Sequence, residues 1–375
     1  MKLTFPHMGN AYVSVKVLLD TLGLDYYLPP IGSRDSFERG IANSPEFMCL
    51  PFKTVLGDFI QGLEHGADTI LFGGGCGQCR LSYYGDLQQE ILRGMGYRFN
   101  YIPLDFKRLT YDEFMNKLGP VLDGAQKARL IPAVTAGVRT VFAVDGLYRQ
   151  ACRVRCREKS AGETDGVMRR FEREVRAARG YPKTRDAIRR ARRALAGIRT
   201  DEALDPVKIG IVGEIFLSSD PFTNLEIEQK LGDMGALAVN TMSVSEWIRK
   251  HFVGALLPVR PKDRAVRAAQ PYMHTDDIGG HGIYTIGNAE LMSRRGFDGI
   301  IQVYPFTCMP EIIAQSALGE IERKNGVPVM TLILDEMTAE TGYVTRLEAF
   351  VDMLQMKKER ESVRRRGRIR TGAKS

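Results

Sequence analysis

Short apolar runs alternate with amphipathic stretches over the first hundred residues. The apolar runs predict strands at residues 2–6, 24–29, 67–72 and 99–104, and the amphipathic stretches predict helices at 10–22 and 82–95. A further helix is expected to begin at Ser44-Pro45-Glu46 and to run through Glu64, because serine is a good N-cap and proline suits the first turn. This alternation is typical of a parallel sheet with helices on its faces.

The same alternation returns after a long helical region. Residues 111–199 have apolar positions at helical spacing, and a second α/β pattern begins at Val207. Its expected strands are 208–212, 236–242, 297–303 and 327–334, and its main helices are 224–234, 284–295, 311–324 and 343–356. We therefore divide the chain into an N-terminal α/β domain (1–110), a basic helical connector (111–205), a C-terminal α/β domain (206–356) and a basic flexible tail (357–375).

One short pattern occurs in both α/β halves. Residues 66–72 and 296–303 each consist of a glycine, an aspartate two residues later and an apolar strand, and a loop cysteine follows. The cysteine is Cys76 in the first half and Cys308 in the second. The likeness predicts two domains of similar topology that face each other. In such sheets the ligand crevice lies beyond the carboxyl ends of the strands.

Charge is distributed unevenly along the 375 residues. The net charge is +8, but residues 149–199 hold 17 Lys/Arg against 6 Asp/Glu, and residues 357–370 hold 8 against 2. The rest of the chain is therefore acidic. Basic helix faces of this kind are usually solvated, and aromatic residues are sparse among them, so we do not expect nucleic-acid binding.

The overall composition is that of an ordinary soluble protein, with 44% apolar and 26% charged residues. The first ten residues lack the pattern of a signal peptide, and no apolar run approaches the length of a membrane span. We expect a cytoplasmic protein whose six cysteines stay reduced and free to bind metal.

Candidate chemistry is concentrated in the loop after the expected strand 67–72. Three glycines, Gly73 to Gly75, precede the CxxC pair Cys76 and Cys79, and a helix follows. Glycines let the backbone approach bound groups closely, and a helix N-terminus favours thiolate over thiol. A pair of this kind can be a redox dithiol, half of a zinc site or part of an iron–sulfur site.

Two further cysteines fall in loops that the fold would bring to the same crevice. Cys49 and Cys308 complete a candidate set of four with Cys76 and Cys79, and soft thiolates select zinc, copper(I) or iron–sulfur centres. Structural zinc sites usually use two compact CxxC-like pairs, whereas two of these ligands are lone cysteines, which favours a [4Fe–4S] cluster. Cys152 and Cys156 share a helix face, and we interpret them as packing or surface residues.

Several motifs together resemble the 2-hydroxyacyl-CoA dehydratase / benzoyl-CoA reductase superfamily, and within it the branch of CoA-substrate-specific enzyme activase-related proteins. They are Gly74-Gly75-Cys76-Gly77-Gln78-Cys79-Arg80 with Tyr83-Tyr84-Gly85, Gly213-Glu214-Ile215-Phe216, Gly280-His281-Gly282, Pro305-Phe306-Thr307-Cys308-Met309-Pro310-Glu311, and Asp335-Glu336 with Arg346-Leu347-Glu348-Ala349-Phe350. The resemblance covers both α/β halves and is specific only in combination.

The resemblance implies two flavodoxin-like (Rossmann-type) domains around an oxygen-sensitive [4Fe–4S] cluster. It also implies electrons delivered by a partner that hydrolyses ATP, a homodimer or a sister subunit, and an acyl-CoA thioester or another small-molecule substrate. Relatives include proteins with a double-cubane cluster. Three cysteine ligands per cubane are typical of those relatives, which leaves one iron without a cysteine ligand. This chain offers four cysteines, so whether one iron is open to substrate depends on whether Cys79 is a ligand. The chain has no GxxxxGK[ST] pattern, and we expect ATP to bind elsewhere.

Three other polar residues lie in strand-end loops or glycine-rich loops of the second half. Glu214 and Asn224 are candidates for substrate binding or for orienting the cluster loop, and His281 is a candidate proton donor. Helix capping by Asn224 and a hydrogen-bonded loop role for His281 are alternatives. The sequence thus predicts an iron–sulfur redox protein, either a low-potential reductase or a dehydratase-like component. A non-catalytic electron-transfer or scaffold subunit is the alternative.

Overall fold

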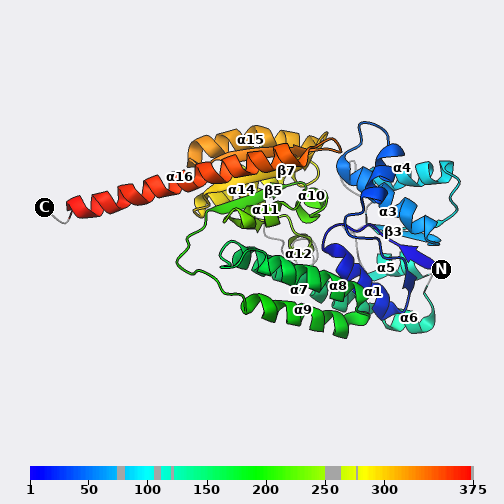
Figure 1. Cartoon of the computed structure of the whole chain (residues 1–375). Coiled ribbons are helices and arrows are strands. Elements are labelled where there is room, and N and C mark those ends of the chain that lie inside the picture. Colours follow the sequence, from blue (N-terminus) through cyan, green and yellow to red (C-terminus); the bar gives the residue numbers. More distant parts are fainter. Residues whose placement is uncertain (74–80, 105–110, 120–121, 250–262, 276–277, 373–375) are drawn as a thin grey trace.

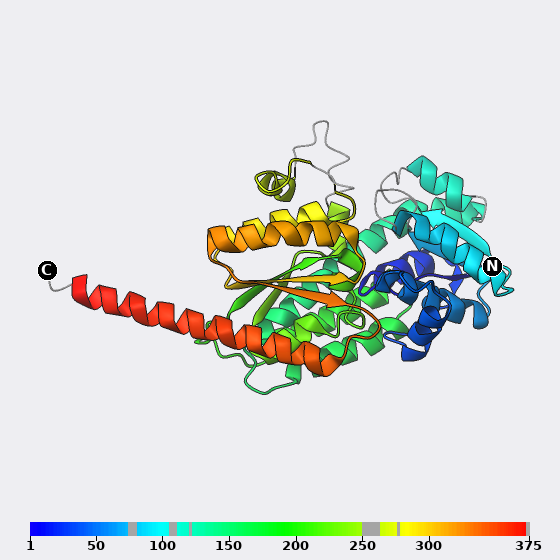
Figure 2. The ribbon, with the colours of Figure 1, turned by 90° about the horizontal axis from the view of Figure 1, so that it is seen from above.

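The computed structural model describes the chain except residues 74–80, 105–110, 120–121, 250–262, 276–277 and 373–375. Two sheet domains lie side by side, and a layer of helices runs beneath both (Figure 1). The view from above shows the first sheet domain beside the second, with the last helix projecting away from both (Figure 2).

The first domain contains a four-stranded parallel sheet in the order β2-β1-β3-β4. Its strands are β1 (Lys2–Thr4), β2 (Asp25–Tyr26), β3 (Thr69–Gly73) and β4 (Asn100–Leu104). Its helices are α1 (Ala11–Leu22), α2 (Arg34–Ala42), α3 (Leu50–Glu64) and α4 (Leu81–Gly94).

The second domain repeats this topology, with a parallel sheet in the order β6-β5-β7-β8. Its strands are β5 (Lys208–Gly213), β6 (Leu237–Asn240), β7 (Gly299–Pro305) and β8 (Val329–Leu334). Its helices are α10 (Ile215–Ser219), α11 (Ile227–Asp233), α12 (Val244–Ile248), α13 (Arg264–Ala269), α14 (Gly282–Arg294), α15 (Met309–Asn325) and α16 (Glu340–Gly372). Every residue of β7 is buried, as expected for a central parallel strand covered on both faces. The predicted α/β fold of two flavodoxin-like domains is confirmed.

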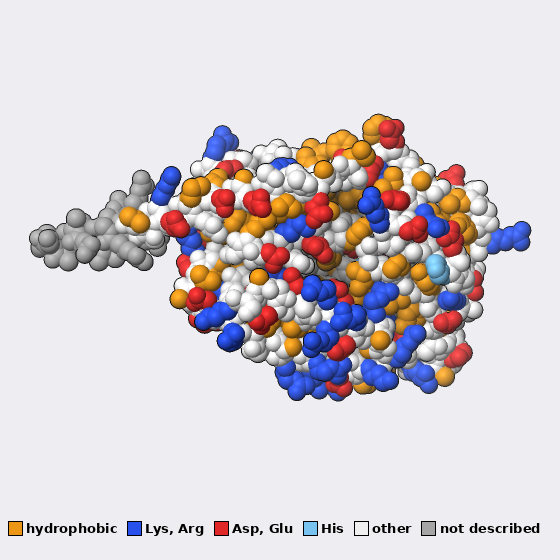
Figure 3. Space-filling model, viewed as in Figure 1, with side chains coloured by type: hydrophobic (Ala, Val, Ile, Leu, Met, Phe, Trp, Pro, Cys, Tyr) orange, Lys and Arg blue, Asp and Glu red, His pale blue; other side chains and the backbone are white. Residues whose placement is uncertain are grey.

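Between the sheets in sequence come five helices. They are α5 (Tyr111–Leu118), α6 (Gly124–Ala128), α7 (Leu130–Arg155), α8 (Glu163–Ala177) and α9 (Gly180–Ala196). The arginine-rich helix α8 buries Met168, Phe171 and Val175, which lie on one helix face, and leaves the charged face outside. Figure 3 shows the resulting gathering of Lys and Arg side chains along the edge where α9 lies.

Helix α7 holds the helical layer against both domains. It packs on α1 and α9 and also contacts α11, α12 and β6 of the second domain. Among the described residues, it is the one helix with the length and apolar composition of a membrane span, and half of its most apolar window is buried inside the protein.

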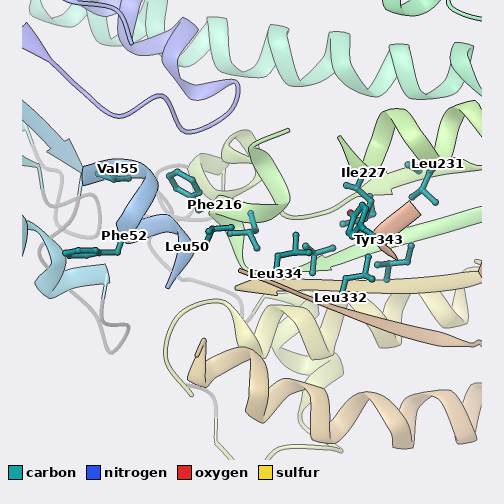
Figure 4. Close-up of a cluster of buried hydrophobic side chains, with 14 of the residues drawn as sticks. Leu50, Phe52, Val55, Phe216, Ile227, Leu231, Leu332, Leu334 and Tyr343 are labelled. Carbon is teal, nitrogen blue, oxygen red and sulfur yellow. The ribbon is translucent and has the colours of Figure 1, made fainter. Parts of the chain in front are cut away.

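The hydrophobic core continues from one sheet domain into the other. Figure 4 shows the cluster that joins Leu50, Phe52 and Val55 of α3 to Phe216 and, beyond it, to the strands of the second sheet. Because the cluster is continuous, the domains are packed together through apolar side chains beside the start of α3.

Three helices differ from the sequence prediction. The helix expected from Ser44 begins at Leu50, because Pro51 in its first turn provides the start signal, and Cys49 is its N-cap residue. The preceding helix α2 was not predicted. The expected flexible tail from residue 357 is instead the continuation of α16, which remains helical through Gly372.

Candidate functional site

Cys49 lies at the N-terminus of α3, next to the first turn of α4. It has extended backbone angles at the N-cap position, and its Sγ lies 2.6 Å from the Tyr84 hydroxyl oxygen. The Tyr84 ring is buried and meets the Phe52 ring edge-on, with the ring centres 4.8 Å apart. Tyr84 therefore ties the start of α3 to the start of α4. Cys76 and Cys79 precede α4 but lie outside the described residues.

Cys308 occupies the corresponding kind of position in the second domain. It follows β7 and is the N-cap residue of α15, with Pro310 in the first turn. The backbone N–H of Cys308 donates to the Pro305 carbonyl at 3.0 Å, and the preceding Thr307 has a left-handed φ of 70°. This tight turn places the thiol at the carboxyl end of a central strand, where α/β sheets bind ligands.

The two cysteine loops meet across the domain boundary. The Thr307 hydroxyl donates to the Phe47 carbonyl at 3.4 Å, which links the residue before Cys308 to the segment before Cys49. One turn into α3, the buried Lys53 ammonium forms an ion pair with Glu336, in the loop after β8. Cys49 and Cys308 therefore begin two helices at one interdomain contact.

Both cysteines stand at the N-termini of helices. Each side chain is partly exposed and each is the N-cap residue of its helix, the end at which the helix dipole stabilises a negative charge. Thiolate is the form that binds soft metals. Among the described residues, no group of three or more His, Cys, Asp or Glu is placed to hold a metal ion. A complete site at this contact would therefore have to include Cys76 or Cys79.

Large apolar side chains are exposed around the contact between the Cys49 and Cys308 loops, which we call the cysteine junction. Phe47 is 72% exposed, Met309 is 62% exposed and Met337, in the loop after β8, is 83% exposed. Figure 3 shows hydrophobic side chains along the edge where the β8–α16 loop and the start of α15 lie. All three side chains belong to the segments that meet at the contact between the Cys49 and Cys308 loops.

Glu214 and Asn224 both bind N–H groups at helix N-termini. The buried Glu214 carboxylate accepts the N–H groups of Phe216 and Leu217 at 3.0 and 2.9 Å, and burial raises the pKa of this carboxyl. The Asn224 side chain is 3% exposed, donates to the Leu217 carbonyl and accepts from the Ile227 N–H. The N-cap residue of α11 is Glu226, so Asn224 does not hold the N-cap position that the sequence left open for it, although it accepts the first N–H of that helix.

His281 is the N-cap residue of α14, and its ring centre lies 6.2 Å from that of Tyr284. Its side chain makes no capping hydrogen bond to the helix. Cys152 and Cys156 are buried at the end of α7, with 5% and 4% exposure, far along the chain from the cysteines of the junction.

A buried polar cluster at the domain boundary was not predicted. The backbone N–H of His7 donates to the Asp58 carboxylate at 2.9 Å, and ring atom Nδ1 of His7 lies 3.6 Å from the Asp220 carboxylate of the second domain. Burial raises the pKa of Asp58 to about 6. Burial also acts to raise the pKa of Asp220, but contacts with His7 and with the backbone N–H groups of Thr223 and Gly9 hold that pKa below its usual range. No sequence motif joins these residues, because they come from three distant segments.

Comparison with models of known protein families and with curated proteins gave no match for this chain.

Proposed function

We propose that this protein is an iron–sulfur redox protein of the 2-hydroxyacyl-CoA dehydratase-like superfamily. The observation that carries the proposal is the meeting of the Cys49 and Cys308 loops at one contact between two flavodoxin-like domains. Cys49, Cys308 and the CxxC pair Cys76 and Cys79 would hold a [4Fe–4S] cluster, which supplies one-electron transfer at low potential when bound.

The donor set fits such a cluster. Soft thiolate ligands at two helix N-termini suit an iron–sulfur cluster, and the Tyr84 hydroxyl lies 2.6 Å from Cys49 Sγ, where it would orient that ligand. The charge of the nearby buried Lys53 is balanced by its ion pair with Glu336, so this lysine leaves no unpaired positive charge beside the cysteines. The chain's own residues would thus hold the cluster, orient the two loops and limit solvent.

We propose that the protein works in the cytoplasm as a component of a larger system with partners. An ATP-hydrolysing reductase would supply electrons. The exposed side chains of Phe47, Met309 and Met337 would form a binding surface for that reductase, for a second copy of the chain, for a sister subunit or for an acyl-CoA substrate. The arginine-rich face of α8 and α9 supports the alternative of an electron-transfer or scaffold subunit, because such a surface steers an acidic partner into place.

The test is anaerobic purification with iron, acid-labile sulfide and zinc measured per chain, together with EPR after reduction. We expect about four irons and four sulfides. Cys49→Ser and Cys308→Ser should each lose or alter the cluster signal, whereas Cys156→Ser, a buried thiol outside the junction, should keep it. Stoichiometric zinc without sulfide, or an unchanged cluster in Cys308→Ser, would refute the shared site. An EPR change on adding acyl-CoA thioesters would favour a catalytic iron over an electron relay.

A further inference from the structure

The buried polar cluster at the domain boundary joins helix α3 to the second sheet domain. Its members are Asp58 of α3, His7 after β1 and Asp220 in the loop between α10 and α11. The side chains of His7 and Asp220 are 8% and 3% exposed, and Asp58 is buried as well. Because Cys49 is the N-cap residue of α3, the cluster links the helix that carries Cys49 to the domain that carries Cys308.

Asp220 makes the direct contact between the two domains. Its carboxylate accepts the backbone N–H of Gly9 at 2.8 Å across the domain boundary, and it also accepts the N–H of Thr223 at 3.0 Å. A Cβ at Gly9 would overlap the Ser219 carbonyl oxygen, so the two backbones approach as closely as glycine allows. The hydrogen bond of the Gly9 N–H therefore exists only while the domains are in contact.

An aromatic side chain of the second domain covers the cluster. The Phe222 ring meets the Phe37 ring of α2 edge-on, with the ring centres 5.7 Å apart. Phe222 lines one cavity together with Asp58, His7 and Asp220, and the volume of about 10 Å³ has room for one water molecule at most. Contact between the domains therefore excludes nearly all water from the Asp58 carboxyl.

The two carboxyl groups respond to this burial in opposite ways. Burial raises the pKa of Asp58 to about 6, the charge of Asp220 adds to the rise, and hydrogen bonds from His7 and Ser36 only partly offset it. Burial also acts on Asp220, but its contacts with His7 and with backbone N–H groups keep its pKa below the usual range. The contact therefore fits a protonated Asp58 beside an ionised Asp220.

Other titratable or charged side chains face the cluster from the neighbouring elements. They include Tyr12 of α1, Tyr27 after β2, and Glu172 and Arg176 of α8. Burial raises the pKa of both tyrosines, so they stay uncharged up to pH 8. A positive charge on His7 would attract Asp220, so proton uptake by His7 would strengthen the contact in the same direction as proton uptake by Asp58.

We propose that Asp58, His7 and Asp220 form a proton-sensitive clasp between the two domains, which tightens in mild acid and loosens above neutral pH. Because the Asp58 pKa is raised in the closed contact, protonation favours closure. This contribution is complete below about pH 3.8 and is lost as the pH rises through about 6. Loosening would free α3, with Cys49, to move relative to the second domain. The clasp does not rest on the function proposed for the cysteine junction.

The test is hydrogen exchange of the full chain at pH 5 and pH 8, with mass spectrometry of the peptide that contains Gly9 and with rates corrected for the intrinsic effect of pH. Protection of the Gly9 N–H reports the clasp because its acceptor lies in the other domain. Protection should be about tenfold greater at pH 5, the value for a carboxyl that titrates at about 6 when closed and at 3.8 when released. Amides of the buried strand β7 should show no such change.

Matched variants identify the group that senses the proton. Asp58→Asn keeps the shape of the side chain and cannot ionise, so the Gly9 peptide should be as protected at pH 8 as at pH 5. Asp220→Ala removes the acceptor of the Gly9 N–H and should lower protection at both pH values. Asp25→Asn, at an exposed position of β2 in the first domain, should follow the parent protein.

Three results would overturn the proposal. One is equal protection of the Gly9 peptide at pH 5 and pH 8 in the parent protein. Another is a full pH dependence in Asp58→Asn, which would place the sensor elsewhere. The third is a loss of protection in β7 together with the Gly9 peptide at pH 8, which would mean unfolding of the second domain instead of opening at the clasp.

Discussion

Asp68 in the first sheet domain and Asp298 in the second occupy equivalent positions, at the amino edges of the two sheets, and accept equivalent hydrogen bonds. Asp68 follows the left-handed Gly66 and accepts the Lys2 N–H at 3.0 Å, and Asp298 follows the left-handed Gly296 and accepts the Lys208 N–H at 2.7 Å. Lys2 and Lys208 are the first residues of β1 and β5. In both domains, one carboxylate thus fixes the start of the first strand against the third.

The carboxyl edges of the two sheets differ. The helix before the third strand has Cys49 as its N-cap residue in the first domain and His281 in the second. After the third strand, the first domain continues into the CxxC segment and the second into Cys308. The comparison indicates that the halves share the residues that build the sheet and differ where chemistry is proposed.

The largest effect should come from the helix crossings that both domains share. A Cβ at Gly57 of α3 would overlap the Ser36 carbonyl of α2, and a Cβ at Gly287 of α14 would overlap the Ala265 carbonyl of α13. Gly57→Ala and Gly287→Ala should each lower the free energy of unfolding by about 3 kcal/mol, since backbone atoms cannot move aside cheaply. Urea denaturation measures this.

Gly319→Ala is the matched control, since a Cβ at this position of α15 meets nothing within 4 Å. It should stabilise the protein by about 1 kcal/mol, because alanine is the better helix former. If one crossing tolerates alanine and the other does not, the two crossings are not equivalent.

An effect that reaches a similar size only at high pH is expected from a buried carboxyl of the second domain. Glu311 of α15 accepts hydrogen bonds from Gln302 and Thr285, each at 3.0 Å, and burial raises its pKa from 4.5 to about 7. The protonated form therefore favours the folded state, so this contribution is complete below pH 4.5 and is lost as the pH rises through about 7. Glu311→Gln should remove the loss, worth up to about 3 kcal/mol.

Urea unfolding of the parent and of Glu311→Gln at pH 5 and pH 8 provides the measurement. The variant should gain relative stability at the higher pH, while the exposed Glu320→Gln should follow the parent at both. An identical pH dependence in the parent and Glu311→Gln would mean that Glu311 is ionised throughout.

The smallest effect on stability is expected for Asp68 and Asp298, the aspartates at equivalent positions in the two domains. Asp298→Ala should cost about 1.5 kcal/mol and Asp68→Ala about 0.5 kcal/mol, because hydrogen bonds to less solvated groups contribute more. The Asp298 side chain is 25% exposed and also lies 3.7 Å from Lys358, whereas that of Asp68 is 52% exposed. Thermal unfolding of both variants checks the order. The reverse order would show that exposure does not set the strength of these contacts.

The sequence predicted the fold well because its signals are local. Each strand of the second sheet is a short apolar run between turn residues, and the glycine–aspartate pattern at 66–68 and 296–298 indicated the shared topology. The start of α3 was placed too early because Ser44-Pro45 matches a good helix-start pattern, whereas the actual N-cap residue, Cys49, is not a preferred one. The tail was misassigned because a run of like charges was given more weight than its helix-forming residues.

The sites were less predictable because their residues meet only in three dimensions. Cys49 and Cys308 were chosen for their chemistry, and the structure brings their loops together, while the part played by Cys76 and Cys79 stays a prediction. Residue spacing along the chain did not indicate the cluster of His7, Asp58 and Asp220. It also did not indicate the hydrogen bond between Cys152 and Glu228. A single sequence carries no signal for such pairs.

The last helix also determines how the molecule moves in solution. Helix α16 packs on the second domain through Tyr343, Leu347 and Leu354, and its later turns extend beyond the body of the protein (Figures 1 and 2). The stretch from Lys357 to Gly372 would span about 24 Å at the usual helical rise. Rotational diffusion should therefore be anisotropic, slower end over end than about the long axis. A label on the last turn of α16 would be held at a distance by a rod and would report the orientation of the second domain.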